Sequence, residues 1–158
     1  MNELTKIKKV LLNRYPETNG NIDHIFDNGD TLLMKALKSK NKILIYNILK
    51  YQDPRNHNVS NKNGYTALMY ASKFRFFDIV KLLVEKYNVD IFKLTKQFKK
   101  ASDICDCQEI IDYLQKTEKI QYSKADMEYK NQKCREQIKN VENWINTNCL
   151  TDDSDEKT

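Results

Sequence analysis

The segments GDTLLMKA at residues 29–36 and GYTALMYA at residues 64–71 are two copies of one pattern, separated by 35 residues. The same shift places the apolar stretch LIYNIL at residues 44–49 on IVKLLV at residues 79–84. A constant offset across two apolar blocks indicates an internal repeat.

Each copy carries local signals for a turn followed by two short helices. An Asn-Gly pair precedes or opens each block, and both residue types tolerate the positive φ of a tight turn. Thr31 and Thr66 can cap the next helix, because a threonine hydroxyl accepts a hydrogen bond from a free backbone N–H. The apolar stretches at 44–49 and 79–84 each form one stripe of a second helix. One unit cannot bury its stripe alone, so the sequence predicts stacked units.

The two copies resemble the ankyrin repeat, a unit of about 33 residues with the signature T-P-L-H-x-A. The resemblance implies an all-α fold, a short ankyrin-repeat solenoid of stacked helix-turn-helix units with a C-terminal helical extension. It also implies a function in binding, through the hairpin tips and the exposed face of the first helices.

Three departures from the family pattern predict marginally stable repeats. Leu32 and Ala67 replace the proline that preorganises the first helix. Methionine replaces the histidine, so we expect the hydrogen bonds of that histidine to the turn to be absent and the methionines to pack into its slot. Lys40 and Arg75 replace the glycine between the helices, which costs about 1 kcal/mol each if φ is positive.

The chain divides into six predicted segments. They are an incomplete N-terminal capping unit at 1–25, ankyrin repeats at 26–60 and 61–92, a truncated C-terminal capping repeat at 93–116, an amphipathic helix at 117–150 and an acidic disordered tail at 151–158.

The net charge of +5 is unevenly distributed. Four acids and one lysine lie in the last eight residues, so the first 150 residues carry about +8. This basicity is compatible with contact to RNA or DNA, for example within a ribonucleoprotein. However, lysine outnumbers arginine 23 to 4, and the abundant residue types are those of A/T-rich codons. We therefore treat nucleic acid as the secondary alternative to a protein partner.

No signal peptide or transmembrane segment is evident in the sequence, which predicts a cytoplasmic or nuclear protein without a membrane partner. The same reasoning predicts that the cysteines are reduced.

The residues needed for catalysis do not occur in a recognisable pattern. His24 and His57 are the two histidines, and both fall in predicted loops. Cys105 and Cys107 are too closely spaced for a structural zinc site and have no second pair of ligands, so Cys105 is expected in the core. Three glycines cannot form a phosphate-binding loop. We therefore expect no enzyme activity, no cofactor, no metal and no small-molecule substrate.

The predicted partner-binding residues lie at the tips and on the first-helix faces, with Tyr65 and Phe74 as aromatic anchors. The aromatic residues of the run at 74–77 are either buried against a neighbour or exposed as a contact patch, and this alternative is open for both Phe74 and Phe76. The full set is Asp27, Asn28, Asp30, Lys38, Ser39, Lys62, Asn63, Tyr65, Lys73, Phe74, Phe76 and Trp144.

Trp144 belongs to the C-terminal helix, for which two roles are open. Its neighbours Cys134, Ile138, Val141 and Ile145 share one helical face. That face either covers the open end of the stack or docks into a partner with Trp144 as its anchor.

Overall fold

The computed structural model describes residues 2–148, which form helices and turns in two compact units that meet between Lys116 and Thr117. The tail predicted for residues 151–158 lies outside the described residues. The helical elements are α1 (Glu3–Arg14), η1 (Pro16–Thr18), α2 (Leu32–Lys38), α3 (Lys42–Tyr51), η2 (Pro54–Asn58), α4 (Ala67–Lys73), α5 (Phe77–Lys81), η3 (Leu82–Lys86), α6 (Ala101–Ile104) and α7 (Gln108–Asn148).

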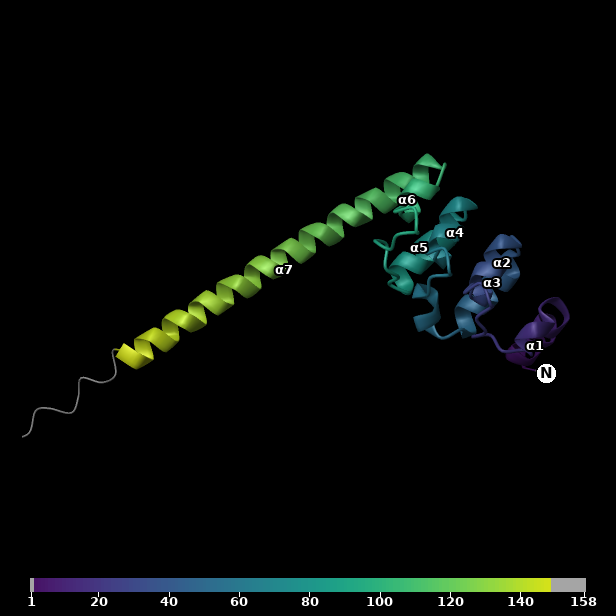
Figure 1. Ribbon diagram of the computed structural model, residues 1–158, viewed down its shortest axis with the longest axis horizontal. Helices are drawn as coiled ribbons and strands as arrows, with labels where there is room; N and C mark the ends of the chain where they lie inside the picture. Colours follow the sequence, from purple (N-terminus) through teal and green to yellow (C-terminus); the bar gives the residue numbers. More distant parts are fainter. Residues whose placement is uncertain (1, 149–158) are drawn as a thin grey trace, which may run out of the picture. The chain divides into compact units, whose positions relative to one another are not determined.

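The first unit is a stack of helix pairs (Figure 1). Helix α2 packs against α3, and α4 packs against α5, which η3 continues as a π-helical turn. Helix α4 lies between α2 and α6, while α1 packs on α3. The first helices of successive pairs therefore form one layer of the stack, as the repeat predicts.

The core of this unit contains the two apolar blocks of the repeat. Leu33, Ala36, Leu68 and Ala71 are buried, as are the residues of the second-helix stripes at positions 44, 45, 48 and 49 and positions 79, 80, 83 and 84. The all-α solenoid that the resemblance implies is confirmed.

The two threonines cap the first helices. The Thr31 hydroxyl accepts a hydrogen bond from the Met34 amide at 3.4 Å, and the Thr66 hydroxyl accepts one from the Met69 amide at 3.3 Å. Both methionines are buried. We expected methionine, in place of the histidine of the family, to make no hydrogen bond to the turn. In the second repeat this expectation was wrong, because the Thr66 amide donates to Met69 Sδ at 3.4 Å.

The turns between the paired helices have the expected strained backbone. Lys40 has φ 53° and Arg75 has φ 60°, where glycine would carry no Cβ penalty. Arg75 also forms a two-pronged ion pair with Asp106, at 2.9 and 2.5 Å. The Arg75 side chain thus makes an ion pair that glycine at this position could not make.

Helix α7 runs from Gln108 to Asn148 without a break. The second helix of the last repeat and the helix expected at 117–150 are therefore one element. In the first unit its start is anchored by Ile110 and Leu114, which are buried. In the second unit, Ile138, Val141, Trp144 and Ile145 are exposed.

Candidate protein-binding surface

Three hairpin tips, at residues 26–30, 61–65 and 95–99, share one backbone pattern. In each, the first residue donates its amide to the carbonyl of the fifth, at 2.9 to 3.0 Å. In each, the amide of the fourth residue donates back to the carbonyl of the first, at 2.7 to 2.9 Å. The fourth residues are Gly29, Gly64 and Phe98, with φ 79°, 82° and 59°.

The tips are joined to one another through the backbone. The Lys62 amide donates to the Asn28 carbonyl at 3.0 Å, and the Lys96 amide donates to the Asn63 carbonyl at 3.1 Å. A Cβ on Gly64 would lie 2.8 Å from Thr95 Cα, and one on Gly29 would lie 3.0 Å from the Lys62 nitrogen. Glycine is therefore needed at the second tip both for its positive φ and for the close approach of the third tip.

A buried polar cluster supports the first two tips. Asp30, with a fully buried side chain, accepts hydrogen bonds from Lys38 Nζ at 2.5 Å, Asn28 Nδ2 at 2.8 Å and Asn61 Nδ2 at 2.8 Å. Burial by itself would raise the pKa of Asp30, but these hydrogen bonds outweigh it and hold the pKa below its ordinary value. Asp30 is therefore ionised and fixes the positions of its neighbours.

An aromatic ladder crosses the face of α4. The Tyr65 and Tyr70 rings stack with centroids 5.2 Å apart, and the Tyr70 and Phe74 rings stack at 6.2 Å. Lys38 Nζ lies 4.6 Å from the Tyr70 centroid, and Lys40 Nζ lies 5.6 Å from that of Phe74. Cations above aromatic rings are attracted by the negative ring faces.

The first-helix face, defined as the α2 and α4 surface that carries this ladder and its lysines, is thus both aromatic and basic. Tyr65 and Phe74 are half-buried, whereas Lys38, Lys40 and Lys73 are exposed. Such a mixture supplies rigid apolar contact area beside positive charge, as protein interfaces commonly do.

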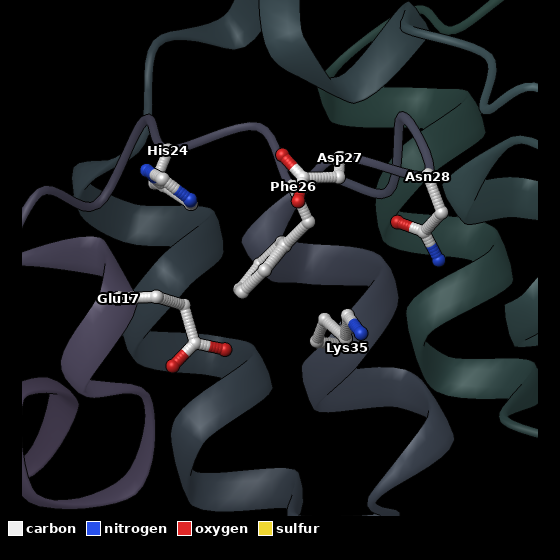
Figure 2. Close-up of a pocket in the computed structure, with 6 residues that line it drawn as sticks. All are labelled: Glu17, His24, Phe26, Asp27, Asn28 and Lys35. Atoms are coloured by element: carbon white, nitrogen blue, oxygen red, sulfur yellow. The ribbon is translucent and has the colours of Figure 1, made fainter.

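A hollow of about 600 Å³ adjoins the first tip. Figure 2 shows the six residues that line it: Glu17, His24, Phe26, Asp27, Asn28 and Lys35. Lys35 Nζ lies 4.7 Å from the centroid of the Phe26 ring, and the His24 ring meets that ring edge-on at 4.8 Å. The hollow therefore places one aromatic ring beside one lysine and the carboxylates of Glu17 and Asp27.

Most predicted site residues of the first unit lie where the resemblance places them. Asp27, Asn28, Lys62 and Asn63 are exposed at the tips. Ser39 is half-buried, and its hydroxyl donates to the Ala36 carbonyl at 2.9 Å. Trp144 lies in the second unit, where 63% of its surface is exposed.

Two predicted contact residues are buried instead. Asp30 points inward to the polar cluster, because a carboxylate beside three donors gains more inside the tip than at its surface. Phe76, 9% exposed, packs into the core. Both therefore shape the surface without presenting their side chains to it.

Sequence reasoning missed Tyr70 and Phe98. Tyr70 lies four residues before Phe74 on the same helix, a spacing that brings two rings together. Phe98 is 82% exposed at the third tip, and its backbone matches that of Gly64, 34 residues earlier. The 35-residue shift carries Gly64 onto Lys99, one residue past Phe98, so the repeat shift alone does not find this position.

Two of the groups considered for catalysis, His57 and Cys105, are used in packing. The His57 ring is buried edge-on against Tyr87, with centroids 4.5 Å apart, in η2 rather than in an open loop. Cys105 is buried as expected, and its thiol donates to the Ser72 carbonyl at 3.1 Å. Within residues 2–148, no three His, Cys, Asp or Glu side chains group so as to hold a metal ion. None of the described helices combines the length and the apolar character that a membrane crossing requires.

A family model for ankyrin repeats, in three copies, matches residues 2–94. Because this match covers more than half of the sequence, the chain belongs to the ankyrin-repeat family. Ankyrin repeats are protein-interaction modules.

Two solved structures show the same fold. The ankyrin-repeat domain of Bcl-3, a member of the IkappaB family, matches with a TM-score of 0.54 and 21% identity over 68% of this chain and 44% of that one. This chain thus spans less than half of the Bcl-3 domain. A chain from the structure of yeast ribosomal protein Rps3 with its chaperone Yar1 matches with a TM-score of 0.50 and 20% identity, over 72% of this chain and 89% of that one. No curated protein matches the sequence.

Proposed function

We propose that this chain is a non-catalytic protein-binding module that holds its partner across the hairpin tips and the first-helix face. The observation that carries the proposal is the aromatic ladder of Tyr65, Tyr70 and Phe74 with Lys38 and Lys40 over its rings. Tyr65 and Phe74 are the central anchors, and Phe98 is a third anchor at the neighbouring tip.

The chemistry of this face selects a partner with acidic and apolar side chains. Lys40 and Lys73 lie beside the anchors and the tips add Lys62 and Lys96, whereas the charge of Lys38 is already paired with Asp30. An acidic segment would gain electrostatic steering toward this face, while its apolar side chains would cover the rings. The net charge of +5 acts in the same direction.

The test is affinity purification from the native cells with wild-type protein and the double variant Tyr65→Ala/Phe74→Ala. The variant should lose at least tenfold in partner recovery, because interface anchors of this kind contribute about 2 kcal/mol or more. A matched control, Tyr122→Ala/Tyr129→Ala, removes two exposed rings from α7 and should leave recovery unchanged. Equal recovery by a folded Tyr65→Ala/Phe74→Ala variant would refute the assignment of this face.

A basic scaffold that contacts RNA or DNA is the second candidate, favoured by the lysines at the tips. It predicts binding to single-stranded RNA or DNA oligonucleotides that weakens steeply with salt, since counterions are released from the phosphates. Binding by a protein partner that survives 0.3 M salt, with no oligonucleotide binding at 50 mM salt, would exclude this alternative.

A further inference from the structure

The exposed side of α7 carries a heptad seam between Ile120 and Ile145. Two series of residues, each with a spacing of seven, make up this seam. The first series is Ile120, Met127, Cys134 and Val141, and the second, offset by four residues, includes Ile138 and Ile145. The five aliphatic side chains among these are 45 to 64% exposed, and Cys134 is also exposed. The remaining positions of the seam are Lys124 and Asn131.

Steps of four and three residues average 3.5, which is the period of a left-handed coiled coil. A helix in water gains most of its stability by packing an apolar face, and this seam offers such a face between Ile120 and Ile145, interrupted at Lys124 and Asn131. Tyr122 and Tyr129 lie on the opposite side of the heptad, so the apolar seam is narrow, as in a two-stranded coiled coil.

We propose that α7 pairs with α7 of a second copy of this chain as an antiparallel coiled coil, with residue 117 of one helix opposite residue 148 of the other. In this register Ile120 meets Ile145 of the second copy, and Met127 meets Ile138. Val141 lies beside the aliphatic stem of Lys124, whose ammonium reaches solvent. Asn131 faces Cys134 near the centre.

Charges beside the seam select the antiparallel direction. Glu128 directly follows Met127, and Arg135 directly follows Cys134, so both flank the seam at equivalent heptad positions. In the antiparallel register Glu128 of each helix faces Arg135 of the other, which gives two opposite-charge pairs in the dimer. In a parallel dimer Arg135 would instead face Lys130 of the other helix, and Lys124 would face its own copy. Opposite charges at these flanking positions set orientation in coiled coils.

The first test measures the mass of the full chain by sedimentation equilibrium over micromolar concentrations. The expected result is a reversible monomer–dimer equilibrium. Ile138→Asp should abolish the dimer, while the control Tyr129→Asp, on the opposite side of α7, should retain it. A monomer at every concentration would overturn the proposal, and it is the result expected if the seam instead covers the repeat stack of its own chain. A dimer that persists in Ile138→Asp would also overturn it.

The second test examines the direction of pairing. Glu128→Arg and Arg135→Glu should each weaken the homodimer about tenfold, because each turns two attractive pairs into repulsive ones. Mixing the two variants should restore dimers, since every cross-dimer pair is again attractive. Glu136→Arg, which changes the same charge away from the seam, should have little effect. A homodimer strengthened by Arg135→Glu would indicate the parallel arrangement and overturn the antiparallel proposal.

Circular dichroism of each variant checks that the repeat stack remains folded. The proposal does not depend on the first-helix face, because the seam and that face lie in different units. If the chain stays monomeric but Tyr65→Ala/Phe74→Ala loses the partner, only the dimer proposal fails. If the chain dimerises but that variant keeps the partner, only the proposed first-helix face fails.

Discussion

Phe98 combines a strained backbone with an exposed aromatic ring. Its φ of 59° occurs at the tip position where the first two tips have glycine, and 82% of its surface is in contact with solvent. A bulky residue in the left-handed region costs about 1 kcal/mol and gains nothing here from burial. This pairing of cost and exposure supports the place of Phe98 among the partner anchors.

Replacing Phe98 by glycine should therefore stabilise the free protein and weaken its binding. The free energy of unfolding should rise by about 0.5 to 1 kcal/mol in urea titrations, because glycine carries no Cβ at positive φ. Recovery of the partner should fall several-fold, because the ring is lost.

Phe98→Ala is the matched control for the backbone. Alanine keeps the strain and removes the ring, so partner recovery should fall as in Phe98→Gly while the urea midpoint does not rise. Unchanged partner recovery in both variants would remove Phe98 from the interface.

His57 makes the stability of the repeat stack sensitive to mild acid. Burial lowers the pKa of His57 below its ordinary value of 6.5, against the opposing pull of Asp53 and Asp23. Within the described residues neither ring nitrogen has a hydrogen-bond partner. The folded protein therefore keeps a neutral imidazole at a pH where the unfolded chain already binds a proton.

A base with a lowered pKa stabilises the fold above its unfolded pKa, and this contribution is lost as the pH falls toward the folded pKa. The unfolding free energy of the wild type should thus decrease from pH 7 to pH 5. His57→Phe, which retains a ring against Tyr87, should show a smaller decrease in urea titrations across the same range. Parallel pH profiles for the two proteins would contradict this account.

At the scale of the elements, the tips act as a backbone ladder across the repeats. The Asn28–Lys62 and Asn63–Lys96 hydrogen bonds join the three tips through main-chain atoms alone, with glycine required at position 64. The side chains on the tips can therefore vary for recognition while the ladder keeps their spacing.

The hydrogen bonds between the second and third tips should be lost if these two tips cannot approach each other. Gly64→Ala should lower the unfolding free energy by about 2 to 3 kcal/mol, through its φ of 82° and a contact of 2.8 Å with Thr95 Cα. Gly20→Ala is the matched control, because Gly20 has φ 72° but its nearest contact would be an ordinary 3.6 Å. Urea titrations should show a clearly larger loss for Gly64→Ala, and equal losses would mean that the approach of the tips contributes nothing.

Local signals predicted much of each element. Thr31 and Thr66 could be assigned as caps because a cap depends on neighbours within three residues. The strain at Lys40 and Arg75 followed from the repeat position alone. The resemblance also implied the first-helix face, but not that Tyr70 would stack between Tyr65 and Phe74.

One error concerns contacts between distant residues, and two others concern the third tip and the bounds of α7. Asp30 was expected at the surface, but Asn61 donates to it from the next tip and Lys38 from the end of α2. Phe98 was overlooked because the third repeat has lost its signature while keeping the backbone of the tip. The continuity of α7 was missed because the expected boundary at residue 117 followed the end of the resemblance to the repeat, and the backbone carries no helix break there.

For the molecule as a whole, the repeat stack should be only marginally stable. The described residues include five non-glycine residues at positive φ, at positions 19, 40, 75, 88 and 98. We expect the free protein to melt below about 50 °C, near the low end for mesophilic domains, and its partner to raise that midpoint by mass action. Differential scanning calorimetry measures both, and a midpoint above about 65 °C for the free protein would contradict the prediction.

The unbroken length of α7 sets a distance. At 1.5 Å per residue, the 32 positions from Thr117 to Asn148 extend about 48 Å. In an antiparallel pair the two repeat stacks would be attached at opposite ends of this span. A partner that presents two copies of its binding segment at a matching separation would engage both stacks at once, and the second contact would form at a high effective concentration. Weak single sites would then produce strong avidity, and only for targets with that spacing.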